Sequence, residues 1–132
     1  MKNITKQRVL ILEDDEMVRL IINDYLIVSG FDAIDAEDPF KALDILKNDP
    51  CDVAIVDINI PKMSGEEFIT KAKTICPDIQ FIIHTGASDY KVSSKMIEMG
   101  LSQNNVLVKP VEDMNSFVSI IKQFDKNLDK II

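Results

Sequence analysis

The chain has 132 residues, of which 46% are hydrophobic and 28% are charged, a balance that indicates one packed globular domain and excludes a disordered chain. Its net charge of −7 repels both a nucleic-acid backbone and an anionic lipid surface, so we expect no direct binding to either. No apolar stretch approaches the roughly 20 residues of a membrane span, and neither Cys51 nor Cys76 has the spacing of a zinc site or a disulfide framework. We therefore expect a cytoplasmic protein whose two cysteines are buried as small apolar side chains.

The first half of the chain predicts two strands, each followed by a helix. An apolar run at 9–12 is typical of a strand covered on both faces. Apolar residues follow at helical spacing between Asp15, which can cap a helix, and Gly30, which can end one. Residues 31–36 alternate between apolar and acidic types, as a more exposed strand does. The Asp-Pro dipeptide at 38–39 then supplies the N-cap and the first position of a second helix.

The second half of the chain predicts three further strands and three further helices. The strands cover residues 53–56, 79–83 and 106–108, and the helices run from the capping box at 64–67 to the residue before Pro77, from Tyr90 to Met99 and from Asp113 to Phe124. Because alternating strands and helices require crossover connections, the pattern predicts a parallel sheet with helices on both faces. We therefore expect a doubly wound α/β fold in a single domain over residues 1–132, with its core at about 8–125.

Charged and hydroxyl side chains follow four of these predicted strands, at the point where each strand ends. They are Glu13 and Asp14, Asp57, Thr85 and Lys109. Ligands of an open α/β sheet bind outside the carboxyl ends of its strands, so we expect these side chains to converge. One lysine cannot neutralise three crowded carboxylates, which must raise their pKa values, pair with cations or hold a hard divalent ion. Oxygen-only donors favour Mg²⁺, although an acidic run after a strand is by itself more often a solvated turn.

Four short motifs at these strand ends resemble those of the receiver domains of bacterial two-component response regulators, including the single-domain chemotaxis type. The motifs are LILEDDEMVR at 10–19, VDINIPKMSG at 56–65, HTGA at 84–87 and VLVKP at 106–110. Each motif alone is a weak signal, but all four occur in order, and the resemblance covers nearly the whole chain. It implies a flavodoxin-like receiver fold with five helices and a five-stranded sheet in the order 2-1-3-4-5.

The resemblance also implies a role for each residue of the predicted site. Asp57 falls on the family's phosphoacceptor, which takes a phosphoryl group from a sensor histidine kinase or a histidine phosphotransfer protein. Asp14 and Asp57 would hold Mg²⁺, with Glu13 acting through a water molecule and the backbone carbonyl of Asn59 as a further ligand. Lys109 would pair with Asp57 before transfer and with the phosphoryl oxygens afterwards.

Thr85 and Val106 occupy the positions through which receivers of this family transmit the conformational effect of phosphorylation to the protein surface. Thr85 is expected to donate a hydrogen bond to the phosphoryl group. An aromatic residue usually stands where this chain has Val106, and a valine has one stiff χ1 and no ring to relocate. We therefore expect a rearrangement of residues 88–105 to take the place of the movement of an aromatic ring. Within this segment, residues 101–105 are predicted to be mobile. His84 is interpreted as a buried core histidine outside the site.

The predicted function is that of a phosphorylation-controlled binding module, which is not an enzyme beyond self-phosphorylation and autodephosphorylation. No output segment follows Phe124, so we expect either a stand-alone switch or the receiver part of a longer protein. A downstream protein or a second copy is expected to dock on the fourth helix, fifth strand and fifth helix.

Two other functions agree less well with these residues. A haloacid-dehalogenase-like phosphohydrolase needs a second aspartate where this chain has Asn59. A flavodoxin-like cofactor binder needs a Gly-rich phosphate loop, and the chain has only four glycines. A degenerate receiver that binds partners without phosphorylation is a further alternative.

Overall fold

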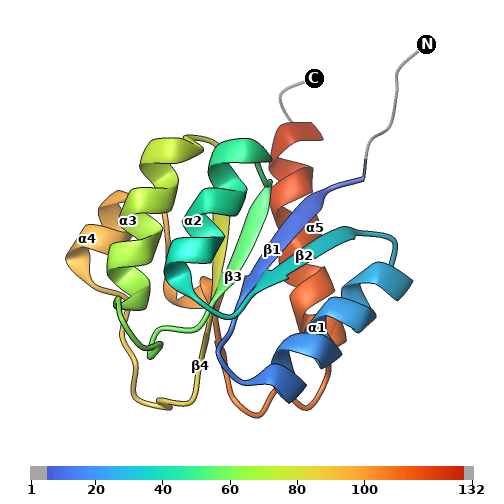
Figure 1. Ribbon diagram of the computed structural model, residues 1–132, viewed down its shortest axis with the longest axis horizontal. Helices are drawn as coiled ribbons and strands as arrows, with labels where there is room; N and C mark the ends of the chain where they lie inside the picture. Colours follow the sequence, from blue (N-terminus) through green and yellow to red (C-terminus); the bar gives the residue numbers. More distant parts are fainter. Residues whose placement is uncertain (1–5, 130–132) are drawn as a thin grey trace.

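Five parallel strands form one central sheet in the order β2-β1-β3-β4-β5 (Figure 1). The computed structural model describes residues 6–129, and side chains through residue 124. Every neighbouring pair of strands is parallel, so the predicted doubly wound, flavodoxin-like topology is confirmed. The strands are β1 (Arg8–Leu12), β2 (Asp32–Ala36), β3 (Val53–Val56), β4 (Gln80–Thr85) and β5 (Val106–Val108).

Helices cover both faces of the sheet, as parallel crossover connections require. Two of them, α1 and α5, pack on one face, and α2, α3 and α4 pack on the other (Figure 1). The helices are α1 (Glu16–Val28), α2 (Pro39–Asn48), α3 (Gly65–Ile75), α4 (Ser94–Glu98) and α5 (Asn115–Asp129), with a 3-10 turn, η1 (Gln103–Asn105), before β5. Within residues 6–129, no helix is both long enough and apolar enough to cross a bilayer.

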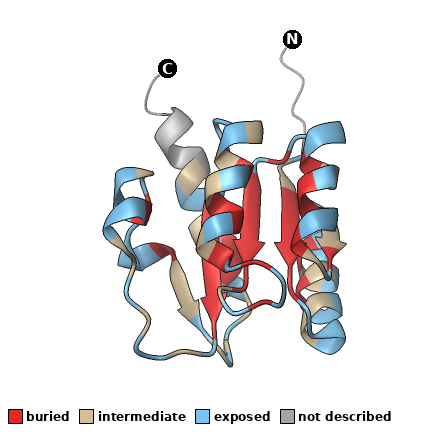
Figure 2. Ribbon diagram, turned by 60° about the vertical axis from the view of Figure 1, so that its left-hand side comes forward, coloured by how far each residue is buried: buried red, intermediate tan, exposed pale blue. Residues whose placement is uncertain are grey.

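Side chains of the central strands alternate between two hydrophobic cores. In β1, Leu10 and Leu12 join the core under α2 and α3, whereas Val9 and Ile11 join the core under α1 and α5. All four are at most 1% exposed. Figure 2 shows the buried strands between helices whose outer surfaces are exposed. Because both faces of the sheet are covered, its inner strands contain continuous apolar runs.

The predicted N-caps of α1, α2 and α3 are confirmed, and of the capping box predicted at 64–67 the Ser64 half is formed. The side chains of Asp15, Asp38 and Ser64 each accept a hydrogen bond from a backbone N–H of the first turn, which satisfies donors that have no partner within the helix. Gly30 follows α1 with a φ of 100°, a left-handed conformation that glycine adopts at low cost. The N–H of Asp15 also donates to Glu13 Oε2 at 3.1 Å, which joins this cap to the end of β1.

In the structure, α4 is shorter and β4 longer than the sequence predicts. The helix covers Ser94–Glu98 instead of 90–99, because the N–H of Tyr90 donates to the carbonyl of Ala87 at 3.1 Å and forms a separate turn. The strand continues beyond its apolar run to Thr85, which pairs with β5. The loop between β4 and α4 is therefore longer than expected.

Several other element boundaries differ from the predicted ones by one or two residues, and α5 ends at Asp129 instead of Phe124. Two of these differences have a clear local reason. β2 begins at Asp32, because the N–H of Phe31 donates to the carbonyl of Leu26 at 3.0 Å and closes the end of α1. α5 begins at Asn115, whose N–H donates to the side chain of Asp113 at 2.9 Å. Phe31 and Asp113 thus belong to the ends of helices and lie outside the regular elements.

Residues 101–105, predicted to be a mobile polar segment, contain η1 and a buried anchor. Asn105 is buried, and its Nδ2 donates to the carbonyl of Phe81 at 2.9 Å. Its Oδ1 accepts a hydrogen bond from the N–H of Ser102, also at 2.9 Å. One side chain therefore joins this segment to β4 and shapes the turn that leads into β5.

Both cysteines are buried, as predicted. Burial raises the pKa of Cys51 to about 11. This thiol is therefore protonated at neutral pH, as expected of a side chain that only fills the core.

Candidate functional site

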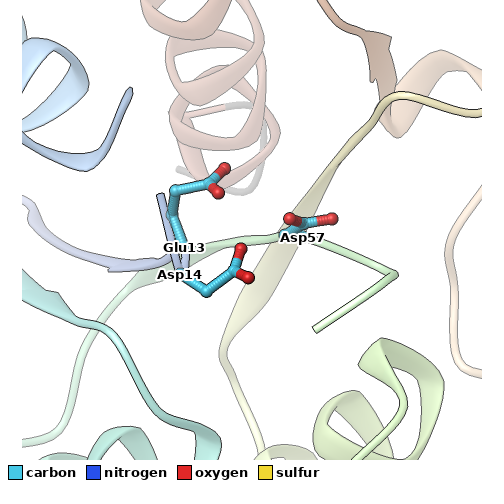
Figure 3. A group of neighbouring side chains, drawn as sticks. All are labelled: Glu13, Asp14 and Asp57. Atoms are coloured by element: carbon cyan, nitrogen blue, oxygen red, sulfur yellow. The ribbon is translucent and has the colours of Figure 1, made fainter. Parts of the chain in front are cut away.

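Three carboxylates lie together at the ends of β1 and β3 (Figure 3). One oxygen from each of Glu13, Asp14 and Asp57 lies within 4.8 Å of the other two. The two strands are neighbours, and the N–H of Asp57 donates to the carbonyl of Leu12 at 3.1 Å. Main-chain pairing therefore holds these acids side by side, and the structure brings together the three carboxylates that we expected to converge.

Lys109, which follows β5, extends into this acidic cluster. Its Nζ lies 2.8 Å from Glu13 Oε1 and 3.1 Å from Asp57 Oδ2. The side chains of Glu13 and Asp57 are 2% and 8% exposed, whereas that of Lys109 is 25% exposed. One ammonium group thus faces two nearly buried carboxylates, and with Asp14 the cluster keeps an excess of negative charge.

Burial and pairing act in opposite directions on these charged groups. Burial raises the pKa of Glu13 above its ordinary value, and a hydrogen bond with Lys109 opposes part of that rise. Burial by itself lowers the pKa of Lys109, but hydrogen bonds to Glu13 and Asp57 outweigh it, so that the pKa is raised. Lys109 is therefore protonated at neutral pH, and additional positive charge nearby would favour ionised Glu13.

The two predicted switch residues lie on β4 and β5. Thr85 is fully buried, and its Oγ1 accepts a hydrogen bond from the N–H of Ala87 at 3.1 Å. Its carbonyl accepts one from the N–H of Lys109 at 2.7 Å, which joins the backbones of these two residues. The hydroxyl proton of Thr85 is not used in either bond. Val106 is half-buried and packs against the core under α2 and α3.

The loop that follows Asp57 is held closely against the start of α3. The N–H of Asn59 donates to Asp57 Oδ1 at 3.1 Å, which orients the carboxylate, while the use of the Asn59 carbonyl as a ligand stays a prediction. A Cβ on Gly65 would lie 2.6 Å from the Cα of Ile58, so only glycine fits there. Lys62 has a φ of 76°, a conformation that costs energy in a residue with a side chain.

Two neighbours of Glu13 lie closer to the acidic cluster than the sequence indicates. The Nδ1 of His84 lies 3.8 Å from Glu13 Oε1, and its ring packs edge-on against Phe117. Burial, and then the charge of Lys109, lower the pKa of His84 to about 4. His84 is therefore a neutral core histidine at pH 7, as interpreted from the sequence. Arg19 donates from a guanidinium nitrogen to the carbonyl of Glu13 at 3.0 Å.

The register of the sheet explains why His84 lies beside the cluster. Val56 pairs with Leu12 on β1 and with Ile83 on β4. The residues that follow these three form one row with side chains on the same face. They are Glu13, Asp57 and His84. The strand register identifies His84 as a neighbour of the acidic cluster. This register cannot be read from the apolar runs of the sequence.

The acidic cluster has the chemistry of a site for a small divalent cation. Its donors are three carboxylate oxygens close enough for one ion to contact more than one of them, and hard cations prefer oxygen ligands. Lys109 compensates only part of the charge. The arrangement can thus hold a cation next to a carboxylate, Asp57, that is itself oriented by a backbone N–H.

Comparison with known proteins identifies the family of this chain. The family model of the response regulator receiver domain matches residues 9–122. The chain is 38% identical over 103 residues to a cyclic di-GMP phosphodiesterase of Thermotoga maritima, covering 78% of this chain and 27% of that protein. It is 33% identical over 122 residues to a probable chemotaxis protein CheY of Rhizobium etli, covering 88% of this chain and 92% of that protein.

The fold is shared with solved structures as well. A crystal structure of a response regulator receiver domain protein from Methanospirillum hungatei has a TM-score of 0.78 and 24% identity, over 96% of this chain and 99% of that one. The chain spans about a quarter of the length of the phosphodiesterase and about half that of a probable transcriptional regulator of Porphyridium aerugineum. The match over residues 9–122 places this chain in the response regulator receiver domain family, the phosphoacceptor switches of two-component signalling.

Proposed function

We propose that Asp57 accepts a phosphoryl group from a sensor histidine kinase or a histidine phosphotransfer protein, and that phosphorylation changes which partners the chain binds. The observation that carries this proposal is the position of the Asp57 carboxylate, within an acidic cluster and 3.1 Å from the ammonium group of Lys109. Membership of the receiver family supports it, because receivers take phosphoryl groups from such donors.

The chain's own residues position and stabilise the transfer. A carboxylate oxygen of Asp57 attacks phosphorus, the P–N bond of the phosphohistidine breaks, and the imidazole nitrogen keeps the electron pair. Phosphoryl transfer depends mainly on positioning and on charge stabilisation. The N–H of Asn59 orients the nucleophile, Lys109 balances charge on Asp57 and then on the phosphoryl oxygens, and the hydroxyl of Thr85 donates to one of these oxygens.

Mg²⁺ is the proposed cofactor of this site. Asp14 and Asp57 would hold it directly, Glu13 through a water molecule, and Asn59 through its backbone carbonyl. When bound, the ion supplies positive charge to the transferring phosphoryl group. The excess of carboxylates over cations supports this assignment.

The proposed output surface consists of α4, β5 and α5, with Thr85 and Val106 beneath it. Ile97 on α4 and Val108 on β5 are 59% and 40% exposed, which provides apolar contacts for a downstream protein or a second copy. We infer a cytoplasmic switch that is not an enzyme beyond self-phosphorylation and autodephosphorylation, and that binds neither nucleic acid nor membrane, as its net charge of −7 favours.

No observation favours the alternative functions. A haloacid-dehalogenase-like phosphohydrolase requires a general acid two residues after the nucleophile, and the amide side chain of Asn59 cannot transfer that proton. A degenerate receiver is expected to lack part of the acidic cluster or its lysine, whereas Asp57, Asp14, Glu13 and Lys109 all meet at one edge of the sheet.

Phosphorylation by a small donor tests the proposal directly. The protein is incubated with acetyl phosphate and Mg²⁺, and its intact mass is measured. The wild type is expected to gain one phosphoryl group in a base-labile linkage, and Asp57→Asn is expected to gain none. Asp15→Asn is the matched control, because asparagine caps a helix as well as aspartate does and Asp15 caps α1 outside the cluster. Equal labelling of Asp57→Asn and the control would refute the assignment.

A further inference from the structure

A carboxylate at the start of α3 holds the loop between β4 and α4. Glu66 Oε2 accepts a hydrogen bond from the hydroxyl of Tyr90 at 2.6 Å, and Glu66 Oε1 accepts one from the hydroxyl of Ser93 at 3.0 Å. Ser93 is in turn the N-cap of α4. Glu66, Tyr90 and Ser93 form one group, the Glu66 cluster, in which both oxygens of a single carboxylate hold the loop and the first turn of α4.

The hydrogen bonds of the Glu66 cluster are stronger than those between two neutral groups. The acceptor is a charged carboxylate, and all three side chains of the Glu66 cluster are half-buried, so water competes with them less than at an open surface. Burial raises the pKa of Tyr90, and its hydrogen bond to Glu66 raises it further. The phenol therefore stays protonated and remains a donor at neutral pH.

A continuous series of hydrogen bonds joins Thr85 to the Glu66 cluster. Thr85 Oγ1 accepts from the N–H of Ala87 at 3.1 Å. The carbonyl of Ala87 accepts from the N–H of Tyr90, also at 3.1 Å, and the hydroxyl of Tyr90 donates to Glu66. If the side chain of Thr85 rotates toward a phosphoryl group on Asp57, Oγ1 moves away from the N–H of Ala87, and the displaced backbone carries Tyr90 with it.

Glu66 is also joined to Asp57 along the chain. The N–H of Gly65 donates to the carbonyl of Ile58 at 3.0 Å, and the contact between these residues leaves no room for a Cβ on Gly65. The residue after Asp57 and the residue before Glu66 are therefore packed together. This contact connects Asp57 to the Glu66 cluster along the chain.

α4 is held by the fully buried side chain of Met96 and by side-chain hydrogen bonds of this kind. The helix has only five residues, and an isolated helix of that length is not stable in water. Gln103 holds the other side of the same loop, because its Nε2 donates to the carbonyl of Tyr90 at 2.9 Å and its Oε1 accepts from the N–H of Val92 at 3.1 Å. Loss of the bonds to Glu66 would therefore free one side of the loop and the start of α4.

We propose that the Glu66 cluster transmits phosphorylation of Asp57 to α4, in place of the aromatic side chain that Val106 does not supply. In the unphosphorylated chain, Glu66 holds the loop and α4 in the observed position. When Asp57 is phosphorylated, the loop shifts, the hydrogen bonds to Glu66 are lost, and α4 becomes free to adapt to a partner. Glu66 is thus a positioning residue, and its role rests on the proposed phosphorylation of Asp57.

Amide hydrogen exchange of the full chain tests this inference. Exchange over residues 88–98 is measured with and without acetyl phosphate and Mg²⁺, and intact mass establishes phosphorylation in each sample. Glu66→Gln removes one of the two acceptor oxygens, and Tyr90→Phe removes a donor while keeping the ring. Glu67→Gln is the matched control, because it makes the same change in the same turn of α3, where the Glu67 side chain is exposed and pairs with Lys71 at 3.6 Å.

Phosphorylation of the wild type is expected to speed exchange over residues 88–98 by about tenfold, the effect of losing one hydrogen bond to a charged group. Unphosphorylated Glu66→Gln and Tyr90→Phe should already exchange at the faster rate, so that phosphorylation adds little. Both should gain the phosphoryl group as the wild type does. Glu67→Gln should keep the complete wild-type response.

Three results would overturn the inference. The first is a phosphorylated wild type whose exchange over residues 88–98 is unchanged, and the second is a full response in both Glu66→Gln and Tyr90→Phe. Either would leave the proposed function intact. The third is a wild type that gains no phosphoryl mass, which would overturn the proposed function and this inference together.

Discussion

Lys109 sets the charge balance of the site. Its ammonium group pairs with Glu13 and Asp57, while Asp14 adds a third carboxylate within 4.8 Å of the others. A buried ion loses its hydration, and one cation cannot compensate three anions. Glu13, which is 1% exposed, loses the most hydration of the three carboxylates. In the metal-free chain, the negative charge of this cluster therefore lowers the stability of the fold.

Glu13→Gln is expected to stabilise the metal-free chain at neutral pH by about 1 kcal/mol, because it removes a buried charge that is only partly compensated. The pKa of Glu13 in the folded chain is raised above 4.5, so the folded wild type binds this proton at a higher pH than the unfolded chain does. As the pH falls through the folded-state pKa toward 4.5, the wild type gains stability relative to the variant. Below 4.5, Glu13 is protonated in both the folded and the unfolded chain, so the difference in stability between wild type and variant becomes small. Urea unfolding with a chelator, from neutral to acidic pH, measures this difference.

The matched control for this prediction is Glu67→Gln, which removes an exposed carboxylate on α3. Exposed ion pairs contribute little to stability, so this variant should unfold nearly as the wild type does. A Glu13→Gln variant that is less stable than the wild type at neutral pH would show that the pairing with Lys109 outweighs the cost of burial.

Gly65→Ala is expected to destabilise the chain by about 1–3 kcal/mol, the usual cost of forcing extra atoms into a packed site. Its Cβ would lie 2.6 Å from a backbone atom, the Cα of Ile58, which cannot move without displacing the loop after Asp57. Phosphorylation by acetyl phosphate should slow as well. Gly86→Ala is the control for stability, since a Cβ there meets nothing within 4 Å. Equal stability of the two variants, measured by thermal unfolding, would contradict the tight contact.

The elements differ in how far the sequence determines them. Helices α1, α2 and α3 could be predicted, because each carries its own N-cap, at Asp15, Asp38 and Ser64. The start of α4 could not, because Tyr90 forms a separate turn with Ala87 and is held there by Glu66 and Gln103, which are distant in the chain. Local propensity predicts a helix there, and tertiary hydrogen bonds override it.

The same distinction applies to the site. The convergence of Glu13, Asp57 and Lys109 could be predicted, since parallel strands bring their carboxyl ends to one edge of a sheet. The proximity of His84 depends on strand register, and the Glu66 cluster depends on contacts between two loops. Neither register nor contacts between loops leave a periodic pattern in the sequence.

Asn105→Ala is expected to destabilise the chain by about 2 kcal/mol, because it leaves buried polar groups without partners. The side chain of Asn105 links η1 to the carbonyl of Phe81 in β4 and so fixes the turn that leads into β5. Asn104→Ala, at an exposed position of the same turn, is the control and should change stability little. Urea unfolding compares the two, and an equal effect would show that η1 does not anchor the segment.

Across the whole molecule, negative charge is in excess and part of it is concentrated at one edge of the sheet. The chain carries a net charge of −7, and the clustered carboxylates follow β1 and β3, two inner strands of the sheet. Unfolding must separate these strands and disperse the carboxylates. A cation that binds the folded cluster therefore stabilises the entire chain and not only the site.

Mg²⁺ is expected to raise the melting temperature of the wild type. At a concentration one hundred times its dissociation constant, a ligand that binds only the folded state adds about 2.7 kcal/mol, which corresponds to roughly 10 °C for a chain of this size. Asp14→Asn and Asp57→Asn each remove a proposed ligand and should lose most of the rise, while Asp15→Asn should keep it. NaCl at matched ionic strength separates specific binding from screening of the net charge. An equal rise with NaCl, or in all three variants, would mean that the three clustered carboxylates do not hold the cation.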